Sequence, residues 1–576
     1  MSRTFIFILL MLLPLASRSQ TLEWEGVVYE IDTTIGEAKV VKVTNFKQKE
    51  YPIQESFVLG GRTYPVTSLV AGAFWWCFNM ESLAIPKYVV NIGFPIFNYS
   101  YPPLSSIEVA PENPKYDSRN GCNALIETST NTLLLGSNNT IIPNTVTTID
   151  KNAFRGLLGL TSLSLPNSVK EICDSAFLGT PYLRDLTLSD SLTFIGNAAF
   201  YRCAITTIKL PNCLRHIGDY AFADNYYNGF ISRTLTLPDS MDYLGRRAFA
   251  NLCIISHVVF PRNLKSILTG TFENCEWTPS ITIPETVVSI EEFAFNNCYK
   301  LSEVKILGSS LQRIGHSAFK DCPSLTSINI PNSVTEICDS AFMRCESLPS
   351  INIPPTLSYL GSAFKRCYNL RSVNLPPDLT EIRDETFYDC GLRSIIIPNS
   401  VKRIGKSAFN GCGYLKDIKL PDNLESIEDS TFYWNFSIIK IVPSTMAEEG
   451  GDSCLILPPT LKHIGKYAFG NNPQLTTVIL PNSLKTIGGG AFSNSFHQMH
   501  RVLKTVVIPA GVEEIGRSAF SLYNPYHYPP EAVEPVMVDD LKDIYCYAVT
   551  PIDCYSIVNE ESEKTLHVPA QSVGLY

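Results

Sequence analysis

The apolar and polar positions of this chain follow one pattern that is repeated along most of its length. The copy at residues 325–342 reads LTSINIPNSVTEICDSAF, and a cysteine follows three residues after its phenylalanine. Such a period indicates a solenoid, in which each unit buries its apolar face only against neighbouring units. Copies aligned on the phenylalanine are mostly 22 to 24 residues apart. About 18 are present, at Phe74, Phe97, Phe154, Phe177, Phe200, Phe222, Phe249, Phe272, Phe295, Phe319, Phe342, Phe364, Phe387, Phe409, Phe432, Phe469, Phe492 and Phe520.

The first half of each copy predicts a short strand. Ile328 and Ile330 alternate with the polar residues Ser327 and Asn329, which is the period of a half-buried strand. Pro331 ends it, because proline cannot donate a hydrogen bond to a neighbouring strand.

The second half predicts a return arm. Val334, Ile337 and Phe342 are spaced by three and five residues, which favours a turn or a short irregular helix over a second long strand. Stacking equivalent strands about 4.8 Å apart predicts a curved parallel β-sheet on the concave face of a solenoid. The phenylalanines would form a column in its core.

The repeated motif resembles the BspA-like class of leucine-rich repeat. The likeness is carried by INIPNSVTEICDSAFMRC (328–345) and IIIPNSVKRIGKSAFNGC (395–412), which contain the strand, the proline, the apolar pair, AF and the final cysteine. It implies a leucine-rich repeat solenoid. The resemblance also implies the secreted or surface location of that class in bacteria and some parasites, where several members are similar to adhesins. The exposed residues would determine the ligand.

The first residues predict export. Arg3 precedes an apolar run from Phe5 to Ala16, and small residues follow at Ser17 and Ser19, as in a secretory signal peptide over residues 1–19. The run is too short to span a membrane. We expect a soluble mature chain that is secreted, held at the cell surface or periplasmic.

The remaining boundaries follow from departures from the repeat. Alternating apolar residues around DTTIGE predict a hairpin, and two long insertions interrupt the repeat, one between Phe97 and Phe154 and one after Phe432. NALIETSTNTLLLG (123–136) in the first is expected to form a hairpin that protrudes from its coil. The end of the chain resembles the C-terminal cap of BspA-like proteins. The predicted organisation is an N-terminal β cap at 20–66, a solenoid at 67–525 with insertions at about 111–136 and about 443–453, and a C-terminal cap at 526–576.

Composition and charge narrow the function. The chain has 576 residues, of which 45% are apolar and 18% charged, as expected of an ordered protein. Its net charge of −9 is spread without a basic run, so neither nucleic acid nor an anionic membrane surface is expected as a partner.

The 17 cysteines predict an interior column more than a disulfide framework. Other coils place asparagine, threonine or leucine at the same position, which indicates a buried site whose thiols are mostly free. Cys546 and Cys554 are the best candidates for a disulfide. The column consists of Cys77, Cys203, Cys275, Cys298, Cys322, Cys345, Cys367, Cys390 and Cys412.

No catalytic motif is present. The chain has no HExxH, GxSxG, P-loop, dinucleotide fingerprint or CxxC sequence, so we expect no enzyme activity, cofactor or metal. A glycosidase-like pair of carboxylates stays an alternative to the absence of enzyme activity, because its two residues need to be close in space and not in sequence. Some side chains could bind a metal ion or act in catalysis, but ordinary solvated positions are favoured for them. They are Glu448, Glu449 and Asp452, His497 and His500, and the pairs Glu291/Glu292 and Glu513/Glu514.

The exposed positions of the strands are the predicted ligand surface. Stacked, they would form a polar face that binds an extended extracellular protein or matrix component, as an adhesin does. A polysaccharide ligand and a passive spacer are the alternatives. Tyr523, Tyr526, His527 and Tyr528 would stack on sugars or pack within the C-terminal cap. The predicted face comprises Thr207, Lys209, Glu303, Lys305, Ser327, Asn329, Ser350, Asn352, Ser372, Asn374, Asp417 and Lys419.

Overall fold

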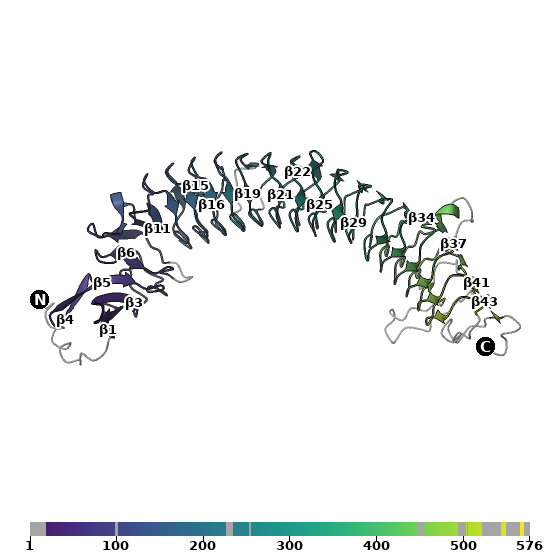
Figure 1. Ribbon diagram of the computed structural model, residues 1–576, viewed down its shortest axis with the longest axis horizontal. Coiled ribbons are helices and arrows are strands. Elements are labelled where there is room, and N and C mark those ends of the chain that lie inside the picture. Colours follow the sequence, from purple (N-terminus) through teal and green to yellow (C-terminus); the bar gives the residue numbers. More distant parts are fainter. Residues whose placement is uncertain are drawn as a thin grey trace, which may run out of the picture. The chain divides into compact units, whose positions relative to one another are not determined.

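The computed structural model divides the chain into two compact units, residues 1–263 and 264–576, which are coloured along the chain in Figure 1. Each unit is a stack of parallel-stranded coils, with about 17 turns among the residues that the structure describes. The structure describes residues 19–97, 102–225, 234–252, 255–446, 454–493, 503, 505–520, 543–548 and 565–568.

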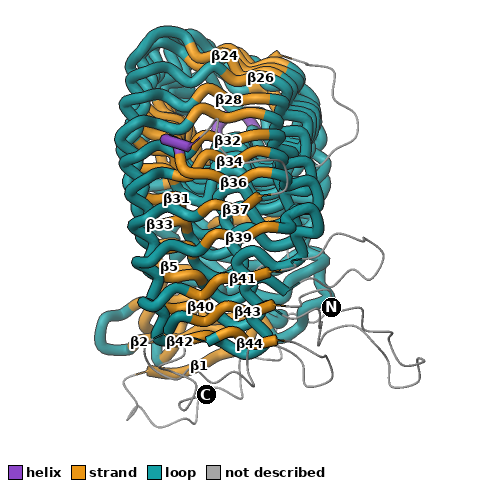
Figure 2. The backbone as a smooth tube through the Cα atoms, turned by 90° about the vertical axis from the view of Figure 1, so that its right-hand side faces the viewer, coloured by secondary structure: helices purple, strands orange, loops and turns teal. Residues whose placement is uncertain are grey.

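Most regular coils contain two strands. The first, here called the main strand, is formed by the alternating segment before the proline, as in β26 (Ser327–Ile328). The second, here called the short strand, has two residues and lies in the return arm, as in β27 (Glu336–Ile337). Figure 2 shows the two kinds of strand as separate columns. The return arm therefore contains a strand where the sequence favoured a turn or an irregular helix.

In the first unit, both kinds of strand pair in parallel with their counterparts in adjacent coils. The main strands are β6 (Ser82–Ile85), β8 (Ser106–Val109), β13 (Ser162–Ser164), β15 (Asp185–Thr187), β18 (Thr234–Thr236) and β20 (His257–Val259). The short strands are β7 (Asn91–Ile92), β12 (Thr148–Ile149), β14 (Glu171–Ile172), β16 (Phe194–Ile195), β17 (His216–Ile217) and β19 (Tyr243–Leu244).

The second unit repeats this arrangement. Its main strands are β22 (Ser280–Ile283), β24 (Glu303–Ile306), β26, β28 (Ser350–Asn352), β30 (Ser372–Asn374), β32 (Ser394–Ile396), β34 (Asp417–Leu420), β36 (Lys440–Pro443), β37 (Cys454–Ile456), β39 (Thr477–Ile479), β41 (Thr505–Ile508), β43 (Asp543–Cys546) and β44 (Thr565–His567). Its short strands are β21 (Ser266–Ile267), β23 (Ser289–Ile290), β25 (Arg313–Ile314), β27, β29 (Tyr359–Leu360), β31 (Glu381–Ile382), β33 (Arg403–Ile404), β35 (Ser426–Ile427), β38 (His463–Ile464), β40 (Thr486–Ile487) and β42 (Glu514–Ile515).

The first unit begins with a mostly antiparallel sheet. The hairpin expected around DTTIGE is formed by the second and third of its strands. Leu69 of the fifth strand pairs in parallel with Ile92 of β7, so this sheet is continuous with a short strand of the first coils. Its strands are β1 (Ser19–Trp24), β2 (Val27–Asp32), β3 (Glu37–Val43), β4 (Ser56–Leu59) and β5 (Arg62–Leu69).

The insertion before Phe154 contains β9 (Tyr116–Asp117), the 3-10 turn η1 (Arg119–Gly121), β10 (Ala124–Glu127) and β11 (Thr132–Gly136). The predicted hairpin is present, since β10 and β11 are antiparallel. It does not protrude, however, because β11 pairs in parallel with β12 and the first three residues of β10 are fully buried. Those apolar side chains gain more from burial than from exposure to water, which explains why the hairpin joins the stack.

The core of each unit is the predicted column of phenylalanine rings. From Phe154 to Phe249, neighbouring ring centroids are 4.8 to 5.4 Å apart. From Phe272 to Phe520 they are 5.1 to 5.7 Å apart. The planes of these rings are inclined by at most 15°. The spacing matches the separation of adjacent strands, so one ring fits in each coil.

The turn that carries the phenylalanine has a demanding backbone. The residues two before and two after it adopt positive φ, as at Ser407 (52°) and Gly411 (73°). Glycine, asparagine and aspartate tolerate this region best, and one of them precedes five of the nine cysteines of the column, whereas arginine or tryptophan has the same positive φ before the other four.

A second glycine requirement comes from coil stacking. A Cβ at Gly405 would lie 2.4 Å from Asp384 Oδ1 and 2.6 Å from the Asp384 nitrogen. The glycine after the short strand therefore allows the preceding coil to approach.

Candidate interaction surfaces

The predicted polar face is exposed on the main strands of the second unit. Glu303 and Lys305 are exposed on either side of the buried Val304. Glu303 pairs in register with Ser327 of the next strand. The pairs Ser350/Ser372 and Asn352/Asn374 are likewise in register and exposed. We call the outward side of these strands the main-strand face.

Other predicted positions differ from the expected pattern. Asp417 is exposed beside Lys440, but Lys419 is half-buried. Asn329 is exposed immediately after β26. Thr207 and Lys209, in the first unit, are exposed but lie outside any strand. The alternation of a short segment fixes which side chains face outward, whereas it does not ensure that the backbone pairs as a strand.

The sequence prediction missed an apolar stripe on this face. Ile456, Ile479, Val507 and Tyr545 are in register on β37, β39, β41 and β43. Ile479 is 50% exposed and Val507 is 45% exposed. The Tyr545 ring stacks on that of His567 in β44 at 4.2 Å. The signal was available in TVILP and TVVIP, where a β-branched residue stands at the outward position that is polar in most copies.

The cysteine column is buried, as predicted, and seven of its thiols have the same kind of hydrogen-bond partner. Cys345 Sγ donates to the carbonyl of Phe319 at 3.2 Å, and Cys412 Sγ donates to that of Phe387 at 3.1 Å. Each acceptor is the anchor phenylalanine of the preceding coil. The cysteines of the column that are free thiols are Cys77, Cys203, Cys298, Cys322, Cys345, Cys367, Cys390 and Cys412.

The same bond explains which residues replace cysteine. Asn435 Nδ2 donates to the Phe409 carbonyl at 3.0 Å. Thr180 Oγ1 donates to the Phe177 carbonyl of its own coil at 3.0 Å. In these coils the position holds a small side chain that can donate, whereas Leu157 fills it with a buried apolar side chain. Burial raises the pKa of the Cys412 thiol to about 12, so this thiol stays protonated and is a poor nucleophile.

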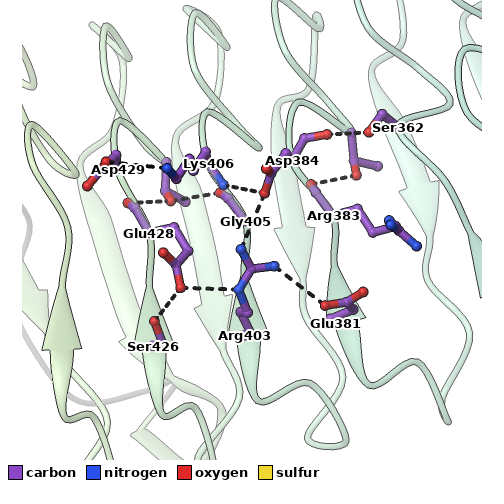
Figure 3. A network of polar contacts seen from close by, with 12 residues as sticks. Ser362, Glu381, Arg383, Asp384, Arg403, Gly405, Lys406, Ser426, Glu428 and Asp429 are labelled. Atoms are coloured by element: carbon purple, nitrogen blue, oxygen red, sulfur yellow. Dashed lines mark hydrogen bonds and ion pairs between the residues drawn. The ribbon is translucent and has the colours of Figure 1, made fainter.

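The short strands carry a polar network that is satisfied within the protein. Arg403 Nε donates to Glu428 Oε1 at 3.1 Å, and its other nitrogens lie 3.5 Å from Glu381 and Asp384. These residues come from three successive coils, as Figure 3 shows. Because each partner already has charged neighbours, this surface favours coil stacking over ligand binding.

The acidic pairs singled out in the sequence lie among similar contacts. Glu291 is 2.7 Å from Arg313, and Glu513 is 2.6 Å from Lys485. Both therefore take part in ion pairs between coils.

An aromatic ladder occupies the short strands of the first unit. The rings of Phe194, His216 and Tyr243 stack at 4.4 and 4.7 Å. Burial lowers the pKa of His216. The stacked faces cover one another, so the ladder presents ring edges to solvent and is poorly suited to stacking on a sugar.

Several predicted candidates lie outside the described residues. They are Glu448, Glu449, Asp452, His497, His500, Tyr523, Tyr526, His527, Tyr528 and Cys554, as well as residues 1–18 of the predicted signal peptide and most of 526–576. Within the described ranges, no group of three or more histidine, cysteine, aspartate or glutamate residues is arranged to hold a metal ion. No helix in the described part of the chain is long and apolar enough to cross a membrane.

Comparison with known families gives one match. The model of the BspA type leucine rich repeat region matches six overlapping segments, at residues 67–144, 147–278, 224–348, 269–393, 335–455 and 380–525. No curated protein sequence matches the chain.

Solved structures also match. A leucine-rich repeat protein from Bacteroides ovatus is 23% identical, with 79% of this chain and 94% of that chain covered and a TM-score of 0.46. A leucine rich cell surface protein from Faecalibacterium prausnitzii is 17% identical, with 96% and 97% covered and a TM-score of 0.25. The pneumococcal vaccine antigen PcpA is 16% identical, with 96% and 98% covered and a TM-score of 0.29.

Proposed function

Because this chain belongs to the BspA-type leucine-rich repeat family, we propose that it is an exported, non-enzymatic recognition protein. It binds an extracellular protein or matrix component through the main-strand face, in the manner of an adhesin. The cell-surface description of the F. prausnitzii protein and the apolar run at the start of this chain support a location outside the cytoplasm.

The observation that carries this proposal is the apolar stripe. Water-exposed β-branched side chains in register on successive strands are costly to solvate, and contiguous exposed apolar surface marks interaction sites. Ile479 and Val507 would form the dry centre of an interface. The hydroxyl and amide side chains of the other main strands would supply its polar rim.

Binding of the full-length protein to an array of matrix proteins and mucins tests this proposal. The double variant Ile479→Ser/Val507→Ser should lose at least tenfold in affinity for a bound protein. The matched double variant Ile35→Ser/Val58→Ser removes side chains of the N-terminal sheet that are 69% and 51% exposed outside the main-strand face, and it should bind normally. Equal binding by both variants would contradict a role for the stripe.

A further variant tests the polar positions. Replacing Lys209, Glu303, Lys305, Asp417 and Lys419 with serine should weaken the same interaction and reduce its dependence on salt. Binding to polysaccharides alone would favour a glycan ligand, and no binding to any component would favour a spacer.

The export proposal has its own measurement. The chain recovered outside the cytoplasm should have lost its first residues, with cleavage near Ser19, and mass spectrometry of its N-terminus would show this. An intact Met1 on the exported chain would contradict the signal peptide.

A further inference from the structure

A cavity in the first unit lies where the insertion interrupts the regular stack. It has a volume of about 230 Å³ and is open to solvent. Trp75 and Phe94 line it together with the half-buried Leu134 and Leu135 of β11. Lys151, Asn152 and Arg155 also line it, from the turn of the next regular coil.

The cavity follows from a shortened turn. In the regular coil, the anchor Phe154 comes five residues after Ile149, and its N–H donates to the carbonyl of Ala176 at 2.7 Å. In the insertion, Gly136 donates in the same way to the carbonyl of Ala153, only three residues after Leu133. Gly136 therefore occupies the place of an anchor phenylalanine without having a ring.

The absence of a side chain at this position is required. A Cβ at Gly136 would lie 2.1 Å from the ring of Phe154. The layer of β11 therefore lacks the phenylalanine ring. Its turn is also two residues shorter than the turn of the regular coil. Leu134 and Leu135 are left as an apolar floor.

The aromatic wall is also built by close packing. The indole of Trp75 lies over Gly72, where an added Cβ would be 2.4 Å from the ring, and Gly72 has φ of +74°. Trp75 is nevertheless 44% exposed and Phe94 is 40% exposed. Two aromatic side chains therefore keep part of their surface available at the opening.

Another part of the lining is cationic. Arg155 donates to Asn152 Oδ1 at 3.1 Å, and Lys151 lies 3.6 Å from Asp174. The residues that line the cavity include these two cations and no carboxylate, so the lining carries a net positive charge. The planar guanidinium of arginine matches a carboxylate in a bidentate geometry.

We propose that this cavity binds a carboxylated sugar, namely a hexuronate residue at the end of a glycan. A bare inorganic anion would leave the apolar floor and the aromatic wall unused. A uronate ring would place its C–H face against Trp75 or Phe94, its carboxylate against Arg155, and its hydroxyls at Asn152 and at the solvent-facing opening. The volume lies below the roughly 300–1,000 Å³ of sites for drug-sized ligands, which suits a single ring. This site is independent of the main-strand face.

Titration calorimetry and saturation-transfer NMR on the full-length protein test the proposal with a matched pair of probes. Methyl β-D-glucuronide and methyl β-D-galacturonide should bind with millimolar dissociation constants. The corresponding glucoside and galactoside, which have a hydroxymethyl group in place of the carboxylate, should bind at least fivefold more weakly. Arg155→Gln should remove most of this preference, and Trp75→Ala should weaken the binding of both classes.

Matched controls keep the test specific. Lys320 follows its anchor phenylalanine as Arg155 does, and Trp277 is 58% exposed in the second unit. Lys320→Gln and Trp277→Ala should therefore bind the uronides normally. Unchanged binding by Arg155→Gln, equal binding of the neutral sugars, or displacement by inorganic phosphate at equal concentration would each overturn the proposal. A melting curve like that of the wild type would show that Arg155→Gln is folded.

Discussion

At the scale of single residues, the anchor phenylalanine and the side chain three residues after it specify each coil. Phe342 is fully buried, and its ring lies between those of Phe319 and Phe364 at 5.5 and 5.7 Å. Cys345 then closes the turn by donating to the preceding coil. One residue supplies dispersion and apolar burial, and the other satisfies a buried carbonyl.

Replacing Phe342 by alanine should therefore lower the free energy of unfolding by about 3–5 kcal/mol, as for other large-to-small core substitutions. Asn329→Ala, at an exposed position of the same repeat, should change the free energy of unfolding by less than about 0.5 kcal/mol. Urea unfolding followed by circular dichroism would measure both. The reverse order would show that the inward and outward positions are assigned wrongly.

The buried thiols predict sensitivity to alkaline pH. A cysteine in the unfolded chain titrates near pH 8.5, whereas burial raises the pKa of Cys412 to about 12. Above pH 8.5 the folded chain thus binds more protons than the unfolded chain. The stabilisation is complete below that pH and is lost as the pH rises toward 12.

Urea unfolding between pH 8 and 10.5, in the presence of a reductant, would test this. Cys412→Ala should make the fall in unfolding free energy shallower by about 1.4 kcal/mol per pH unit, which is the effect of one proton. Asn435→Ala changes a residue of the same column that does not titrate, so it should lower stability without changing the slope. The idea fails if Cys412→Ala leaves the slope unaltered.

At the scale of elements, the sequence predicted the main strands and missed the short ones. The segment around Ile328 alternates over several residues, and that is a detectable period. Glu336–Ile337 has two residues, which is too short for any period, and its pairing depends on the equivalent strands of the coils before and after it. The insertion hairpin was predicted from its own residues, but its place in the stack depended on β12, which is a tertiary contact.

The glycine after the short strand should be a sensitive element of this stacking. Gly405→Ala forces a Cβ to within 2.6 Å of the backbone of Asp384, so the coils must separate locally. We expect a loss of about 1–3 kcal/mol, as for other overpacked sites. Gly413→Ala is the control, because its nearest neighbour would be 3.8 Å away. Gly405→Ala should melt at a lower temperature than Gly413→Ala. Equal melting temperatures would show that the coils at Gly405 can accommodate a Cβ.

At the scale of the whole molecule, the periodic part of the chain defines the scaffold, and the departures from the period define the surface features that are specific to this protein. The repeat was sufficient to predict the solenoid because every copy contributes the same core positions. The apolar stripe and the cavity beside Trp75 arise where copies differ. In TVVIP an outward residue is apolar, and in the insertion Gly136 replaces a ring. The exposed polar residues were predicted individually, but nothing in their period identifies a ligand.

The same architecture predicts that damage stays local. In a solenoid each coil contacts only its neighbours, so stability is close to a sum of coil and interface contributions. Phe177→Ala should increase hydrogen exchange in the coils of Phe154 and Phe200 and leave residues 319–364 protected. Phe342→Ala should do the opposite, with faster exchange around Phe319 and Phe364 only. Exchange measured by mass spectrometry at peptide resolution resolves these regions. If either substitution deprotected both units to the same extent, the chain would unfold as one cooperative block, and the nearest-neighbour description of this solenoid would be wrong.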